Sequence, residues 1–373
     1  MSPKPDSAVQ SEKPASPSGG AAPLPPPPHA LLRWDQVPED FVECFILSGY
    51  RRLHLSAQQC LASAFQPTNE TLNFWTHFVP LLVFVCRFGR LLLFQGAGIS
   101  PLHPALLPLW CYASGVLLTL GMSCAAHLFS CLSLRLRAAF FYLDYASISY
   151  YGFASTVAYA HYLLPRLRLL DAGVLTPYVE GWLGWCAEEV SHLLELYHAC
   201  ILPVAFVLAL GCTAACCLSR AQGCSYPFAV RTFVFIMPLS MACPVMGESL
   251  LFDLRRSNPT LFLYFHRRYL WLLVAAFFNV SKIPERLRPG RFDIVGHSHQ
   301  LFHLLTALSI YDQAHYVEQG LQQYLQHMQG SEDSISPQPT LIGTLGLMVL
   351  LLLCLGLLVR RCLQGTRLNC KHK

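Results

Sequence analysis

The segment at residues 341–359 reads LIGTLGLMVLLLLCLGLLV and contains no Asp, Glu, Lys or Arg. Its length is close to the ~20 apolar residues that an α-helix needs to cross a bilayer. The whole chain has the same character, because 54% of its 373 residues are hydrophobic and 13% are charged, whereas a soluble domain has about 25% charged residues. This composition excludes an intrinsically disordered protein and argues against an ordinary soluble enzyme.

Seven other apolar runs have a similar length. They lie at about 74–95, 104–127, 139–161, 200–218, 228–250, 262–280 and 299–317. We therefore predict an all-α fold, a polytopic membrane helical bundle with a seven-span core at 74–317 and an eighth span at 341–359. Because Arg87 and Arg90 interrupt the first run, seven spans is the alternative count.

Basic residues are distributed unevenly among the connecting segments. Cytoplasmic loops of membrane proteins carry an excess of Lys and Arg. With the N-terminus inside, most of the 26 Lys and Arg residues fall on the cytoplasmic side, and 318–340 contains none. Both termini are therefore predicted to be cytoplasmic. The net charge of +5 is modest, so we expect the lipid bilayer, and no nucleic acid, as a partner.

The segments outside the apolar runs differ in composition. Residues 1–31 are rich in Pro, Ser, Ala and Gly and are expected to be a disordered cytoplasmic tail. The mixed stretch from 34 to 65 is predicted to be helical, within an amphipathic cytoplasmic segment at 32–73. We expect an extracellular loop at 318–340 and a basic cytoplasmic tail at 360–373.

A few polar side chains fall within the apolar runs, where they are expensive and usually functional. With the orientation above, His127 ends the second run and Asp144 begins the third, both at the cytoplasmic side. His299 and His303 begin the seventh run at the same depth, on one face of a helix because they are four residues apart. The same spacing places Ser123 one turn from His127.

These residues fit a zinc site. Three imidazoles, those of His127, His299 and His303, with one open position form the usual pattern of a catalytic zinc. The open position would hold water, whose pKa the metal lowers to ~7. Asp144 would orient or deprotonate that water, and Ser123 would hydrogen-bond the water or a substrate carbonyl. The alternative is a structural zinc that only joins three helices, and the sequence leaves both open.

The same pattern resembles the progestin and adipoQ receptor family. It consists of Ser123-x3-His127, then Asp144, then His299-x3-His303. The strings NETLNFWTH at 69–77 and PGRFD at 289–293 are also similar to that family, and the resemblance covers roughly residues 34–318.

The resemblance implies a plasma-membrane receptor for progestins and related neurosteroids that acts through G proteins. In the adiponectin-receptor branch it implies seven spans, an intracellular N-terminus and zinc on the equivalents of His127, His299 and His303, with ceramidase-type hydrolysis attributed to the branch. This chain departs from that branch in its eighth apolar segment, 341–359.

Three hypotheses remain open at this point. The first is a steroid receptor with an apolar pocket between the spans and a structural zinc. The second is a zinc-dependent lipid amide hydrolase, ceramidase-like, in which Asp144 is the base and Ser123 polarises or positions the substrate. The third is a membrane scaffold whose Pro-rich tail at 1–31 recruits partners. The first two are compatible if steroid binding controls hydrolysis.

Overall fold

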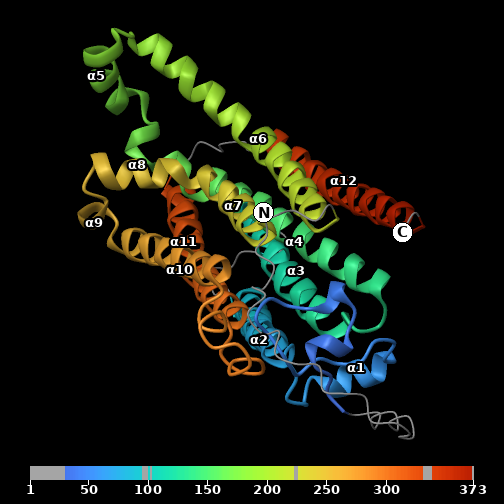
Figure 1. Cartoon of the computed structure of the whole chain (residues 1–373). Coiled ribbons are helices and arrows are strands. Elements are labelled where there is room, and N and C mark those ends of the chain that lie inside the picture. The colour runs from blue at the N-terminus through green and yellow to red at the C-terminus, as the bar shows by residue number, and fades with distance from the viewer. Residues whose placement is uncertain (1–29, 95–99, 101–102, 222–225, 331–337, 372–373) are drawn as a thin grey trace, which may run out of the picture.

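The computed structural model describes residues 30–94, 100, 103–221, 226–330 and 338–371. Within these residues the chain is a bundle of long helices without a β-strand (Figure 1). The predicted all-α membrane bundle is therefore confirmed. The Pro-rich tail lies, up to residue 29, outside the described residues.

The long helices of the described part match the eight predicted runs. They are α2 (Thr71–Phe94), α3 (Leu107–Phe129), α4 (Leu134–Tyr162), α6 (Ala187–Ala221), α7 (Pro227–Ile236) with α8 (Cys243–Leu251), α10 (Pro259–Ser281), α11 (Ser298–Gly330) and α12 (Gln338–Lys371). Three shorter helices are α1 (Ala57–Ser63), α5 (Ala172–Leu183) and α9 (Leu254–Ser257).

Six helical segments of the described part are long and apolar enough to cross a membrane. They are α2, α3, α6, α7 with α8, α10 and α12. The other two long helices, α4 and α11, are continuous but less apolar. They contain Ser, Tyr, His and Gln residues, many of which are buried inside the bundle. Length and apolarity therefore support six of the eight predicted spans, and α4 and α11 are the polar helices of the bundle.

The predicted run at 228–250 is not one continuous α-helix. Helix α7 ends at Ile236, a 3-10 turn covers Met237–Ala242, and α8 begins at Cys243. Pro238 and Pro244 lie at the starts of the second and third pieces. Proline has no backbone N–H to donate and clashes with the preceding turn, so the α-helical hydrogen bonds are interrupted here.

The predicted helix at 34–65 is wrong. Most of this stretch is irregular, with 3-10 turns at Trp34–Gln36 and Glu39–Phe41, and only α1 is α-helical. Leu32 and Tyr50 pair in an antiparallel bridge through backbone hydrogen bonds of 2.8 and 3.1 Å. Phe45 and His54 have positive φ angles, which an α-helix does not contain.

A loop was expected at 318–340. Residues 318–330 are instead helical, because α11 continues to Gly330. The first residue of this segment, Glu318, accepts two hydrogen bonds from the Arg87 guanidinium at 2.6 and 2.8 Å. This ion pair fastens the extended part of α11 to α2. Residues 331–337 lie outside the described residues.

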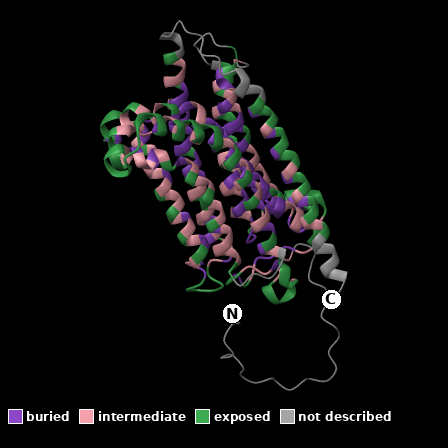
Figure 2. Cartoon of the chain, turned by 90° about the horizontal axis from the view of Figure 1, so that it is seen from above, coloured by how far each residue is buried: buried purple, intermediate pink, exposed green. Residues whose placement is uncertain are grey.

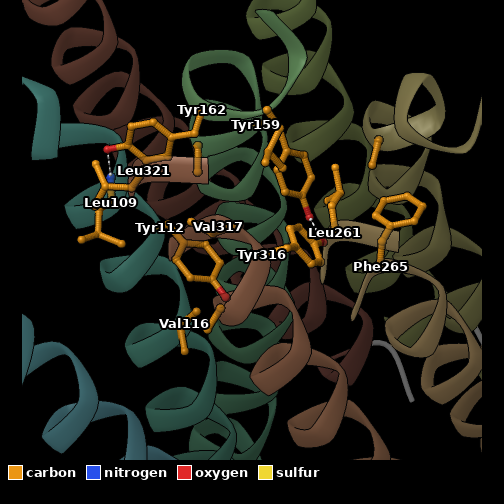
Figure 3. Close-up of a cluster of buried hydrophobic side chains, with 14 of the residues drawn as sticks. Leu109, Tyr112, Val116, Tyr159, Tyr162, Leu261, Phe265, Tyr316, Val317 and Leu321 are labelled. Atoms are coloured by element: carbon orange, nitrogen blue, oxygen red, sulfur yellow. Dashed lines mark hydrogen bonds between the residues drawn. The ribbon is translucent and has the colours of Figure 1, made fainter. Parts of the chain in front are cut away.

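The core lies between α3, α4, α10 and α11. Figure 3 shows Leu109, Tyr112, Tyr162 and Tyr316 packed there, and all four side chains are buried. The Tyr162 hydroxyl donates to the carbonyl of Ala105 (2.6 Å) and accepts from the Leu109 amide (3.1 Å). In Figure 2 the buried residues follow the inner faces of the helices, and the exposed ones lie outside.

Helices α3 and α4 approach closely at Gly115. A Cβ at this position would lie 3.0 Å from the Tyr151 Cα and 3.0 Å from the Ala154 Cβ. Small residues at helix contacts of membrane proteins permit this kind of backbone approach. Gly121, further along α3, has no such neighbour within 4 Å.

We expect Gly115→Ala to destabilise the protein by about 1–3 kcal/mol, because α3 and α4 must separate to accept the methyl group. Gly121→Ala is the matched control and should be neutral or stabilising, since Ala favours a helix over Gly. The measurement is thermal unfolding of the purified variants in lipid nanodiscs. Equal midpoints for both variants would contradict the close packing described for α3 and α4.

Candidate metal centre

Three histidines meet at the end of the bundle where α3 ends and α11 begins, which we call the site end. They are His127 of α3 and His299 and His303 of α11. Their candidate ligand atoms all lie within 4.8 Å of one another. His127 and His303 are buried, and His299 is partly buried. The four-residue spacing predicted from the sequence therefore does place His299 and His303 side by side, facing His127.

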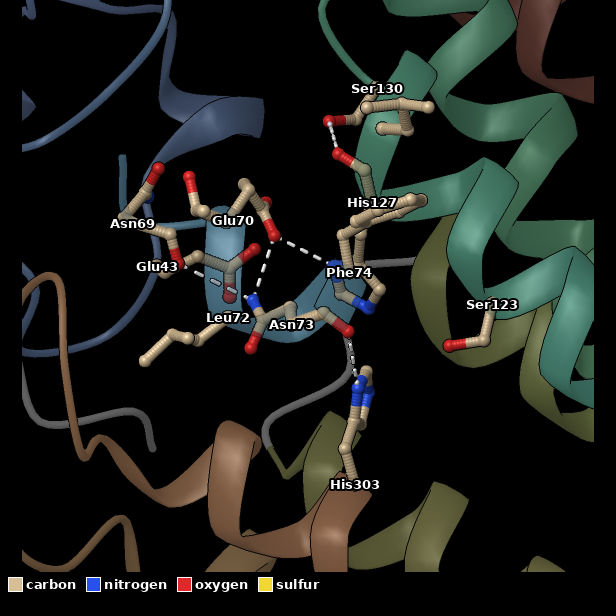
Figure 4. A network of polar contacts seen from close by, with 12 residues as sticks. Glu43, Asn69, Glu70, Leu72, Asn73, Phe74, Ser123, His127, Ser130 and His303 are labelled. Atoms are coloured by element: carbon tan, nitrogen blue, oxygen red, sulfur yellow. Dashed lines mark hydrogen bonds and ion pairs between the residues drawn. The ribbon is translucent and has the colours of Figure 1, made fainter. Parts of the chain in front are cut away.

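Residues at the start of α2 orient two of the rings (Figure 4). The Nδ1 of His127 lies 2.7 Å from the Glu70 carboxylate, which also accepts from the Asn73 amide at 2.8 Å. The Nδ1 of His303 lies 3.0 Å from the backbone carbonyl of Asn73. Carboxylates and carbonyls accept hydrogen bonds, so Nδ1 is the donor in both rings, and in the neutral ring Nε2 is free to bind a metal.

Glu70 immediately precedes α2 and is buried. Burial raises the pKa of this carboxyl, but the neighbouring His127, followed by Arg137 and Arg51, outweighs burial and holds the pKa well below its usual range. The hydrogen bonds that Glu70 accepts, and the two nearby arginines, favour the ionised form of its carboxyl. An ionised carboxylate behind a ligating imidazole increases the basicity of the ring and strengthens metal binding.

The surroundings of the third ring, His299, show whether the three residues fit a metal. Within the described residues, the Nδ1 of His299 is buried without a hydrogen-bond partner. An unsatisfied buried polar atom costs about 1–3 kcal/mol, and coordination would satisfy this ring. Three converging imidazoles, two of them oriented by acceptors, are a donor set suited to zinc with one open position. The cluster fits the expected cofactor.

His77 of α2 was not among the residues predicted for the site. Its ring stacks on that of His303, with centroids 3.9 Å apart, and its Nδ1 lies 2.8 Å from the Ser123 hydroxyl. Its Nε2 is buried and has no partner among the described residues. The sequence did contain a signal for these residues. His77 is a histidine inside the first apolar run, and the polar residues Glu70 and Asn73 lie just before that run.

Ser123 and Asp144 lie in the same cavity as the three histidines. Asp144, on α4, is buried, and its Oδ1 has no hydrogen-bond partner among the described residues. Ser123 is held by His77. The structure thus brings all five predicted residues to one cavity, and the roles predicted for Ser123 and Asp144 stay predictions.

The cavity is large and has two different ends. Its volume is about 1360 Å³. From the histidines it extends between α4, α7, α10 and α11 to Tyr159 and Arg268. Much of the wall between the ends is apolar, with contributions from Ile148, Phe235, Ile236, Leu239, Leu272, Ala275, Ala276, Phe302 and Ile310.

Comparisons with known proteins agree with this architecture. A family model described as "Haemolysin-III related" matches residues 65–313. Membrane progestin receptor gamma of Mus musculus is 34% identical over 283 residues, which cover 75% of this chain and 78% of that protein. Membrane progestin receptor delta of Mus musculus is 35% identical over 296 residues, 76% of each chain. Membrane progestin receptor beta of Sus scrofa is 28% identical over 291 residues, covering 76% and 74%.

We expect Glu70→Ala to weaken Zn²⁺ binding about 10- to 100-fold, because His127 would lose the carboxylate that orients its ring. Glu188→Ala is the control, since the Glu188 side chain is 83% exposed on α6. Affinity would be measured by competition with a chromophoric chelator. Unchanged affinity in Glu70→Ala would show that Glu70 does not support a ligand.

Proposed function

The chain belongs to the haemolysin-III-related family of membrane proteins, and we propose that it is a plasma-membrane receptor for progestins or related neurosteroids. The similarity to membrane progestin receptors gamma and delta extends over about three quarters of the chain, which supports the same ligand class.

The large cavity is the observation that carries this proposal. A ligand pocket for a drug-sized molecule has roughly 300–1,000 Å³ and is lined mainly by apolar side chains with a few polar groups. The cavity of about 1360 Å³ exceeds that range and combines an apolar wall with polar ends. A steroid has matching chemistry, since its rigid apolar body carries one or two polar groups at its ends.

Zinc in this receptor would have a structural role. His127 comes from α3 and the other two ligands from α11, while Glu70 and Asn73 attach both to the start of α2. A bound metal would join α3 to α11 at the site end, and the hydrogen bonds of Glu70 and Asn73 would connect the ligands to α2. The residues of this chain orient the rings.

Signalling through G proteins is part of the proposal and rests on the family resemblance together with the charge distribution. The connection between α10 and α11 lies at the site end and exposes Arg286, Arg288 and Arg291. With both termini in the cytoplasm, as the charge distribution favours, this basic loop would face a cytoplasmic G protein. The scaffold hypothesis depends on residues 1–31, of which 1–29 lie outside the described residues.

A zinc-dependent lipid amide hydrolase is the second candidate, and one observation favours it. Asp144 is a buried carboxyl with an unpartnered oxygen in the cavity that contains the histidines. When bound, zinc would supply a Lewis acid that polarises an amide carbonyl and activates water. Asp144 would accept the proton from the water, and Ser123, held by His77, would position the lipid amide. Steroid binding could then control hydrolysis.

For the receptor, we expect Ala276→Phe to reduce progesterone affinity at least about tenfold, because a ring at this position fills the cavity and overpacking costs about 1–3 kcal/mol. Leu273→Phe is the matched control, since Leu273 is 65% exposed and does not line the cavity. Binding would be measured with labelled progesterone on purified protein in nanodiscs. Absence of saturable binding by the wild-type protein would refute the receptor proposal.

For the hydrolase, we expect Asp144→Asn to abolish release of fatty acid from ceramide and to leave progesterone affinity intact, because an amide cannot accept the proton from water. Zinc content, measured on the same preparation, should stay at the wild-type level. Wild-type turnover by Asp144→Asn, or no turnover by zinc-loaded wild-type protein, would remove the enzyme hypothesis.

A further inference from the structure

Arg268 lies at the end of the cavity opposite the histidines. It is near the middle of α10 (Pro259–Ser281), and only 4% of the residue is exposed. Its neighbours in the cavity wall are Tyr151 and Tyr159 of α4. A guanidinium is thus buried deep in an apolar bundle, in contact with the space that we assign to the ligand.

This guanidinium has no carboxylate partner among the described residues. Its Nη1 donates to the hydroxyls of Tyr159 and Tyr316, the latter at 2.6 Å, and its Nε is buried without a partner. The adjacent Arg267 differs, because it donates to both carboxylate oxygens of Asp312 at 2.7 and 2.5 Å. The charge of Arg268 is therefore uncompensated by the described protein.

Burial of a charge without a countercharge is costly. The idealised penalty for moving an ion into a low-dielectric interior is of order 20 kcal/mol, and several kcal/mol remain after relaxation. Ionisable residues that persist inside membrane bundles mark ligand and ion pathways more often than structural sites. Neutral hydroxyls satisfy hydrogen bonds of Arg268 but not its charge, so an anion is the partner that the site lacks.

A hydrogen-bond network holds the hydroxyls in place around Arg268. The hydroxyls of Tyr159 and Tyr316 lie 2.8 Å apart (Figure 3), and the Gln313 amide donates to Tyr159 at 2.5 Å. Tyr151 in turn donates to the Gln313 carbonyl. The network fixes the positions of the tyrosine hydroxyls and the guanidinium beside the cavity, and fixed binding groups lower the entropic cost of binding.

Thr306 of α11 adds a second free group to the cavity. It lines the same space, and its hydroxyl is buried without a partner among the described residues. Two residues that line the cavity, Arg268 and Thr306, therefore each have a buried donor without a partner, one charged and one neutral. Sulfate and carboxylate groups accept several hydrogen bonds and match the guanidinium fork.

We propose that Arg268, with Tyr151 and Tyr159, forms an oxyanion-binding site for the acidic group of a lipid ligand, whose apolar body extends along the cavity towards the histidines. The ligand class is a steroid sulfate or another lipid whose oxyanion is ionised at neutral pH. The proposal rests on the receptor function proposed above and specifies which chemistry the ligand carries at one end.

The test compares two ligands that differ only in the charged group, pregnenolone sulfate and pregnenolone. Wild-type protein in nanodiscs should bind the sulfate at least about tenfold more tightly, as expected for a buried charge-assisted hydrogen bond. Arg268→Gln should lose this preference while its affinity for pregnenolone stays within about twofold. Arg268→Lys should keep part of the preference, because it retains the charge without the fork.

Arg256→Gln is the control for loss of one positive charge, since the Arg256 side chain is 90% exposed on α9. It should keep the full preference for the sulfate. The proposal is overturned if wild-type protein binds both steroids equally, if Arg268→Gln keeps the preference, or if it loses both ligands to the same extent. The last result would assign Arg268 a purely structural role.

A second pair, oleate and oleyl alcohol, separates this proposal from the receptor proposal. If neither steroid binds but wild-type protein prefers oleate and Arg268→Gln does not, the oxyanion site stands and the steroid receptor fails. If progesterone binds and neither anion is preferred over its neutral partner, the receptor stands and the oxyanion site fails.

Discussion

The contact between Glu70 and His127 connects the irregular N-terminal segment to the helical bundle. Glu70 holds the imidazole from one side. Arg51, from the same segment, donates to the carbonyls of His127 and Leu128 at 2.5 and 2.8 Å. The end of α3 is thereby fixed through both its side chain and its backbone. Because carbonyls at a helix C-terminus lack intrahelical partners, Arg51 also caps α3, and the position of the metal cluster depends on this buried acid and base.

The remaining polar groups follow the same constraint, since a polar atom in a membrane bundle needs a partner. Arg87 is paired with Glu318, and Arg267 is paired with Asp312. The buried atoms without partners are therefore informative. Several of them, on His77, Asp144, His299, Arg268 and Thr306, belong to residues that line the one large cavity described here. Their concentration around that space is the main structural argument that it holds a ligand.

Helical periodicity and depth in the membrane were enough to predict part of the site from the sequence. His299 and His303 share a helix face because of their spacing, and the uneven distribution of basic residues placed His127 and Asp144 at the same depth in the membrane.

Three site residues were missed, namely Glu70, Asn73 and His77. Their roles depend on how the start of α2 packs against α3 and α11. Arg268 was not predicted as a site residue, because it lies near the start of the run at 262–280, whereas α10 begins earlier, at Pro259, which places Arg268 further inside the helix. The irregular stretch near Phe45 depends on positive φ angles that hydropathy does not encode.

The break between α7 and α8 has a consequence for the shape of the cavity. Two backbone carbonyls near the break accept side-chain donors from other helices, Val234 from the Cys212 thiol at 3.3 Å and Leu239 from the Tyr269 hydroxyl at 3.1 Å. Leu239 lines the cavity, and neither Cys212 nor Tyr269 does. One wall of the cavity is thus held by two side chains, Cys212 of α6 and Tyr269 of α10, that do not line the cavity themselves. Substitutions of Cys212 or Tyr269 would therefore change the shape of the cavity, and with it the ligand preference, although neither residue lines the cavity.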